Sequence, residues 1–92
     1  MLKNYYTLKS KFVAREVGGE LVVVPLTGNI AHMNELFTFN ASAKLLWDEL
    51  KEDSTEESLV QVLLNTYEVN VAVAQADVKK FLARLEQMGS KY

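Results

Sequence analysis

Two adjacent glycines between two runs rich in β-branched residues constrain the fold of this chain most. Gly18 and Gly19 separate the segment FVAREV from the segment ELVVVPL. The favoured two-residue hairpin turns need positive φ angles, which glycine adopts without steric cost. The sequence therefore predicts an antiparallel hairpin that begins at Phe12. Pro25 lacks an amide donor, so it belongs at the end of the second strand or on an edge.

A third strand is predicted at residues 36–39, which read LFTF. Side chains alternate along a strand, so Phe37 and Phe39 share one face while Leu36 and Thr38 share the other. The strand is apolar on both faces. An edge strand of this kind is either covered by the protein or left open for an incoming strand.

Three helical segments are predicted after the strands, over residues 41–51, 55–67 and 71–88. Asn40 is a good N-cap for the first, and Thr55 with Ser58 three residues later caps the second. The third is long and amphipathic, and Gly89 is expected to stop it. Three antiparallel strands followed by three helices make an α+β fold.

The ninety-two residues suffice for one domain. Residues 1–11 alternate polar and aromatic side chains, and we expect them to form a loosely held N-terminal arm. The domain proper is expected over residues 12–92.

Catalytic chemistry finds little support in the composition. The chain has no cysteine and one histidine, His32, which excludes thiolate chemistry and leaves no second histidine for a transition-metal site. The serines fit no nucleophile motif, and the paired carboxylates belong to exposed helix faces. We expect no catalytic residues, no metal, no cofactor and no enzymatic activity.

The net charge and the hydropathy of the sequence argue against two classes of partner, nucleic acids and membranes. A formal net charge of −2 argues against nucleic acid, because nucleic-acid-binding domains usually carry a basic excess. No apolar run approaches the roughly 18 residues of a membrane span, and we expect a cytoplasmic protein without membrane contact.

The apolar stripe of the third helix could remain partly uncovered by so small a sheet and two short helices. Beside an open strand edge, such a stripe would form a groove suited to an extended peptide. Its candidate residues are Val78, Phe81, Leu82 and Leu85.

The residues at the joints of these elements resemble a known family. The segments that carry the resemblance are VAREVGGELVVVPL, FTFNASAKLLWDEL, STEESLVQVLLNTYEVN and AQADVKKFLARLEQMG. Together they are similar to the coenzyme PQQ synthesis protein D (PqqD-like) family, the peptide-recognition domains of ribosomal peptide-modification pathways. The resemblance implies a winged-helix-like domain that binds the leader of a precursor peptide. It would present this leader to a modifying enzyme, often a radical SAM enzyme, and would not itself be a catalyst.

The resemblance also implies where the leader binds. It would add as an antiparallel strand to the third strand, with its side chains directed toward the third helix. This mapping falls on Leu36, Phe37, Thr38 and Phe39, and on Val78, Phe81, Leu82 and Leu85. The chain departs from many members in the longer connection TGNIAHMNE before the third strand.

Two alternatives remain open on the sequence. One is a winged-helix DNA-binding domain whose third helix reads the major groove, against which stand Asp77 and Glu86 on that helix. The other is a structural homodimer formed through open strand edges. Lys79, Lys80 and Arg84 could attract an acidic leader, although a solvated charged face explains them as well.

Overall fold

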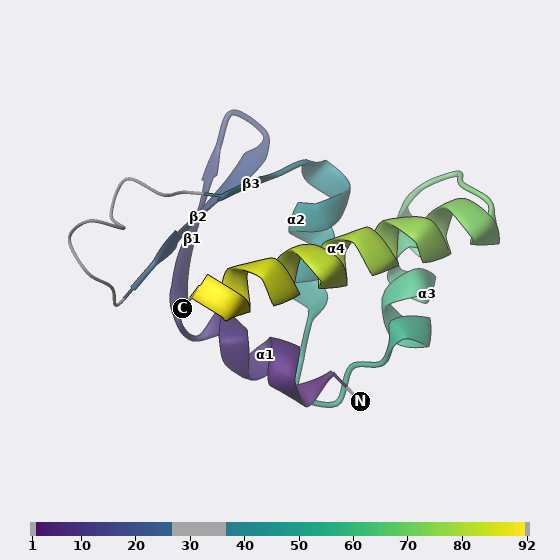
Figure 1. The fold of residues 1–92 in the computed structure, drawn as a ribbon. Coiled ribbons are helices and arrows are strands. Elements are labelled where there is room, and N and C mark those ends of the chain that lie inside the picture. The colour runs from purple at the N-terminus through teal and green to yellow at the C-terminus, as the bar shows by residue number, and fades with distance from the viewer. Residues whose placement is uncertain (1, 27–36, 92) are drawn as a thin grey trace.

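The computed structural model describes residues 2–26 and 37–91, and has four helices and three strands in them (Figure 1). The elements are α1 (Lys3–Lys9), β1 (Phe12–Val17), β2 (Glu20–Pro25), β3 (Phe37–Phe39), α2 (Ala41–Glu49), α3 (Glu56–Thr66) and α4 (Val71–Lys91). The strands pair antiparallel in the order β1-β2-β3. The α+β fold with a three-stranded sheet followed by helices is therefore confirmed. His32 and Leu36 lie outside the described residues.

The predicted hairpin has its turn at the two glycines. Gly18 and Gly19 have φ angles of 60° and 84°, the signs that a type I′ turn requires. Val17 pairs with Glu20 across the turn, and the register continues to Phe12 opposite Pro25. Pro25 is the last residue of β2, where its missing amide costs the ladder least.

The two predicted N-caps are present. The Asn40 side chain accepts a hydrogen bond from the Ala43 amide at 3.0 Å and begins α2. Thr55 and Ser58 form a reciprocal capping box at α3, in which each side chain accepts a hydrogen bond from the other's backbone amide. α2 ends at Glu49, two residues before the predicted end.

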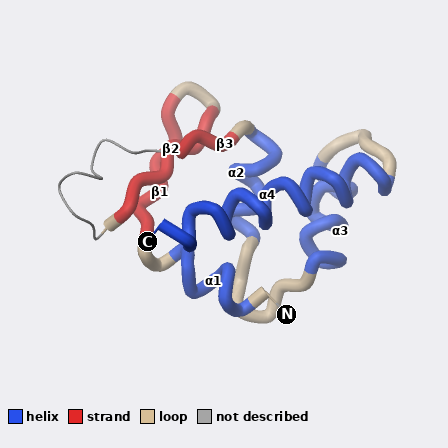
Figure 2. Tube along the Cα trace, viewed as in Figure 1, coloured by secondary structure: helices blue, strands red, loops and turns tan. Residues whose placement is uncertain are grey.

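The helices form a second layer on one face of the sheet, in which α2 contacts β2 and β3 and Phe81 of α4 contacts Phe39. Helix α3 packs against α2 and α4 and lies away from the strands (Figure 2). The core lies between these two layers and is formed by Phe12, Leu21, Val23, Phe39, Leu46, Trp47, Leu50, Leu59, Leu63, Ala74, Val78, Phe81, Leu82, Leu85 and Met88.

The N-terminal segment is not a loose arm, and the prediction for residues 1–11 was wrong in this respect. Residues Lys3–Lys9 form helix α1, which packs against α4. Leu2, Tyr5 and Leu8 recur every three residues and lie partly buried against the core. The Lys9 Nζ donates hydrogen bonds to the carbonyls of Trp47 and Leu50 at the end of α2.

Gly89 does not stop the last helix, contrary to the sequence prediction, because α4 continues to Lys91. Its role is close approach to α1. A Cβ atom on Gly89 would lie 3.1 Å from Cδ2 of Leu8, which is tighter than ordinary van der Waals contact. The glycine therefore lets α1 and α4 meet rather than breaking the helix.

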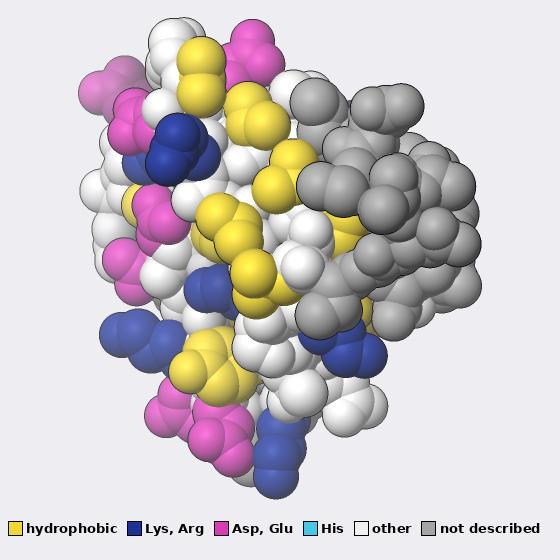
Figure 3. All heavy atoms as spheres, turned by 90° about the vertical axis from the view of Figure 1, so that its left-hand side faces the viewer, with side chains coloured by type: hydrophobic (Ala, Val, Ile, Leu, Met, Phe, Trp, Pro, Cys, Tyr) yellow, Lys and Arg dark blue, Asp and Glu magenta, His cyan; other side chains and the backbone are white. Residues whose placement is uncertain are grey.

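The outer face of the sheet is partly apolar. Val13 and Val17 are exposed on β1, and Val22 and Val24 are half-buried beside them on β2. Figure 3 shows a band of hydrophobic side chains on the side of the molecule where the sheet lies. Within the described ranges, none of the helices is long and apolar enough to cross a membrane.

Candidate functional site: the open edge of β3

Strand β3 lies at an edge of the sheet, and its hydrogen-bonding pattern follows from the hairpin. The two-residue turn makes Val17 and Glu20 a hydrogen-bonded pair, and such pairs alternate along antiparallel strands. The backbone groups of Leu21 and Val23 therefore point toward β3. Their partners there are Phe39 and Phe37.

Thr38 is then the residue of β3 whose backbone N–H and C=O point away from the sheet. It lies opposite Val22, which is bonded to β1, and its side chain is exposed on the outer face. Among the described residues, no strand pairs with this side of β3. An extended chain can pair there without any change in the sheet.

A groove of about 480 Å³ runs beside this edge, between β3, the start of α2 and α4. Its lining residues are Glu20, Thr38, Phe39, Asn40, Ser42, Ala43, Leu46, Asp77, Lys80, Phe81 and Arg84. The lining combines an apolar floor with a polar rim. Ligand sites are usually built this way, with apolar side chains that bury the ligand and a few polar groups that orient it.

Phe39 is the centre of the floor. Its ring lies 6.0 Å from the Trp47 ring and 5.9 Å from the Phe81 ring, centroid to centroid, and only 1% of the residue is exposed. The Arg84 guanidinium lies 4.6 Å above the same ring, within cation–π range. Phe39 thus fixes β3 against α4 and holds one charged group at the groove.

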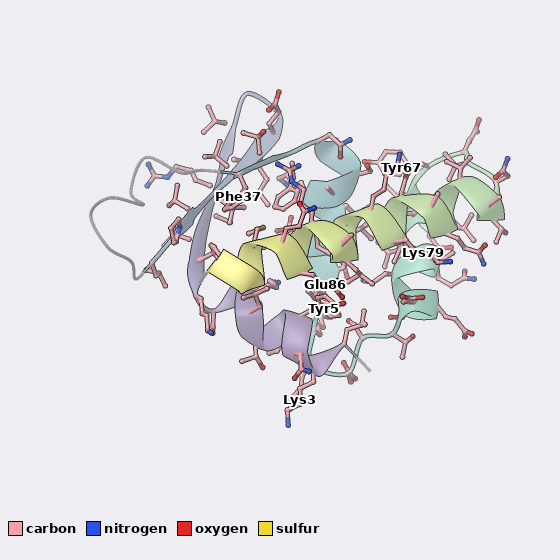
Figure 4. The ribbon with its side chains drawn as sticks, in the orientation of Figure 1. Lys3, Tyr5, Phe37, Tyr67, Lys79 and Glu86 are labelled. Atoms are coloured by element: carbon pink, nitrogen blue, oxygen red, sulfur yellow. The ribbon has the colours of Figure 1, made fainter. Side chains whose placement is uncertain are left out.

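The α4 wall of the groove is charged. Asp77, Lys80 and Arg84 are spaced by three and four residues, so they lie on one face of the helix. Lys79 lies elsewhere: it lines a second cavity, of about 740 Å³, between α3 and α4 (Figure 4). The ion pairs found among the described residues involve Lys3 and Lys44, and not these bases.

The structure divides the predicted site residues into two groups. Thr38 and Phe39 line the groove. Phe37, on the same strand, does not line it and contacts Phe12 instead, with ring centroids 6.4 Å apart, while Leu36 falls outside the described part of the chain. The α4 residues are at most 5% exposed and belong to the core: Val78, Phe81, Leu82 and Leu85. Phe81 alone among them lines the groove, and Val78 lines the cavity against α3.

Sequence reasoning missed the acidic and capping residues that line the groove. From the sequence, Asp77 serves only as an argument against DNA binding, and Glu20, Asn40 and Ser42 have no predicted role at a site, yet all four line the groove. Their position on the helix could have indicated them, because Asp77, Lys80 and Arg84 lie along the border of the apolar stripe of α4. In the described ranges no group of three or more histidine or acidic side chains could hold a metal ion.

Comparisons with known proteins agree with this fold. The chain is similar to a solved structure of TbiB1 in complex with the TbiA(beta) leader peptide, with a TM-score of 0.68, 22% sequence identity and 86% of each chain covered. No curated protein sequence matches the chain. The sequence model of coenzyme PQQ synthesis protein D (PqqD) matches residues 20–89, which is more than half of the chain. The chain therefore belongs to the PqqD family.

Proposed function

We propose that this domain is a non-catalytic module that binds the leader segment of a ribosomally made precursor peptide as an added antiparallel strand on β3. The observation that carries the proposal is the open edge at Thr38 beside a groove with an apolar floor. Family membership supports it, as does the likeness in fold to TbiB1, which was solved with a leader peptide bound.

Two sets of contacts would hold the peptide. The Thr38 N–H and C=O would exchange hydrogen bonds with one peptide residue and so provide affinity without regard to sequence. Peptide side chains at alternate positions would then enter the groove above Phe39 and Phe81 and set the register.

A bound leader would lie at the surface of the domain, where a modifying enzyme such as a radical SAM enzyme could reach the rest of the precursor. Two copies of the domain could also pair through their β3 edges. Such a homodimer would use the same backbone groups as the peptide, so the two states would compete.

Substitutions at Thr38 test the proposal. Because the Thr38 amide points away from β2, Thr38→Pro removes an outward donor and leaves the ladder with β2 intact. Thr38→Ala retains the donor and is the matched control. We expect leader peptides from neighbouring open reading frames to bind the Ala variant and to bind the Pro variant at least about tenfold more weakly, from the lost bond and the clash of the ring.

Amide shifts in a nuclear magnetic resonance titration provide the second readout. Peptide should shift residues 37–39 and the α4 residues at the groove, whereas a short DNA duplex should shift neither. Equal binding by the Pro and Ala variants would contradict strand addition. Shifts on α4 with DNA alone would favour the winged-helix DNA-binding alternative.

A further inference from the structure

The charged row on α4 gives the groove a polarity along its length. Asp77, Lys80 and Arg84 all line the groove, in the order acidic, basic, basic from the N-terminal to the C-terminal side. Neither Lys80 nor Arg84 forms an ion pair with another described residue. Their charges are therefore available to a ligand in the groove.

The spacing of this row suits an extended chain. Helical rise places successive members about 4.5 and 6 Å apart along the axis, whereas side chains on one face of a strand repeat every 6.4–6.8 Å or so. The long side chains of Lys80 and Arg84 can make up the difference. Peptide residues at alternate positions can thus meet the three charges in turn.

The direction of the peptide follows from the fold. Figure 1 shows β3 and α4 running in opposite directions, since β3 leads toward α2 while α4 returns toward the sheet. A strand added antiparallel to β3 therefore runs in the same direction as α4. Its N-terminal part lies toward Asp77 and its C-terminal part toward Arg84.

Arg84 is held in place before any ligand binds. Its guanidinium stacks on the ring of the fully buried Phe39, and the residue is only partly exposed. A preorganised guanidinium loses less side-chain entropy when it pairs with a carboxylate than a freely moving one does. Of the three charged side chains, Arg84 is therefore the one that Phe39 preorganises for binding.

We propose that the groove selects a peptide in which a basic residue is followed two and four residues later by acidic residues. The inference rests on the proposed function, because it assumes a strand added to β3. The basic side chain faces Asp77, and the acidic side chains face Lys80 and Arg84. The match of charge and direction makes an extended segment of this pattern the occupant of the groove.

Three synthetic peptides test the order of the charges. They share Thr and Val flanks and carry the cores Lys-Val-Glu-Val-Glu, Glu-Val-Glu-Val-Lys and Gln-Val-Gln-Val-Gln. Affinity is measured by fluorescence anisotropy, and the Thr38 amide shift reports binding at β3. We expect the first peptide to bind about three- to thirtyfold more tightly than the reversed one, because the pairs at Asp77 and Arg84 change from attraction to repulsion while the pair at Lys80 is unchanged.

Two neighbouring lysines provide the matched variants. Lys80→Glu and Lys79→Glu change the net charge equally, but only Lys80 lines the groove. We expect Lys80→Glu to weaken the first peptide about three- to thirtyfold and Lys79→Glu to change it less than about twofold. Replacing the middle Glu of that peptide by Lys should restore binding to the Lys80→Glu variant.

The outcomes separate this inference from the function on which it rests. If all three peptides shift the Thr38 amide with equal affinity, the charge pattern is overturned while strand addition stands. Tighter binding of the reversed peptide, or equal effects of Lys79→Glu and Lys80→Glu, would also overturn the charge pattern. If no peptide shifts the Thr38 amide, strand addition and the charge pattern both fail.

Discussion

Lys9 joins the N-terminal helix to the end of α2, and its removal should destabilise the domain. The Lys9 Nζ lies 2.5 Å from the Trp47 carbonyl oxygen and 3.2 Å from that of Leu50. α2 has no basic residue in its own last turn, so Lys9 supplies the positive charge that the C-terminal end of a helix favours. The same Nζ lies 5.5 Å from the centroid of the Trp47 ring.

The magnitude follows from two opposing effects. Two hydrogen bonds from a charged donor would contribute about 3–6 kcal/mol together at face value. Burial opposes them, because it lowers the pKa of Lys9, and the attraction of Asp48 offsets this only in part. Lys9 remains half-exposed, so water can take over part of the lost bonding. We therefore expect Lys9→Met to lower the free energy of unfolding by about 1–2 kcal/mol.

Urea denaturation and thermal melting measure this loss. For a domain of this size the Tm should fall by roughly 5–15 °C. Lys3→Met is the control, since Lys3 lies on the same helix and its ion pair with Glu52 is exposed. It should change stability by less than about 0.5 kcal/mol. Equal effects of the two substitutions would refute the capping role of Lys9.

Two further predictions concern the contact between α1 and α4. The Tyr5 hydroxyl donates a hydrogen bond to Glu86, and this bond, with burial and the nearby carboxylates, raises the pKa of Tyr5 to about 12. In the native state Tyr5 therefore stays protonated to a higher pH than in the unfolded chain. The stabilisation of the native state by this hydrogen bond is complete below pH 10 and is lost as the pH rises to about 12. Melting temperatures of the native protein and of Tyr5→Phe should converge over that range, and parallel curves would contradict the prediction. Gly89→Val should lower stability by about 1–3 kcal/mol through overpacking against Leu8, and Leu8→Ala in the same chain should reduce that cost. Strictly additive losses in urea denaturation would show that the two residues do not share this contact.

The elements that were predicted correctly depend on local chemistry. A glycine pair that needs positive φ defines the hairpin, and side chains that accept from nearby amides define the starts of α2 and α3. These signals lie within four residues of each other. These local signals predict the turn and the two helix starts without reference to tertiary contacts.

The elements that were missed depend on tertiary contacts. A helix as short as α1 is not stable alone, and it forms because Leu8 meets Gly89 and Lys9 caps α2. Gly89 was wrongly predicted to end the helix for the same reason. A glycine is required there by the close contact between α1 and α4 and not by a turn. No local pattern predicts either contact.

The site shows the same division. The sequence located β3 because its aromatic alternation is local, but it could not tell whether the apolar stripe of α4 faces the core or a groove. The structure places Leu82 and Leu85 in the core, and the charged residues at the edge of the stripe face the groove. Hydrophobic periodicity identifies a buried face without identifying what buries it.

The most direct test of strand addition is hydrogen exchange at the amides of β3, with and without a leader peptide. In the free protein the Thr38 amide should exchange rapidly, and the Phe39 amide, which bonds to Leu21, should be protected. Bound peptide should protect Thr38 to a level near that of Phe39. A Thr38 amide that is already protected in the free protein, or that stays unprotected in a saturated complex, would contradict the account.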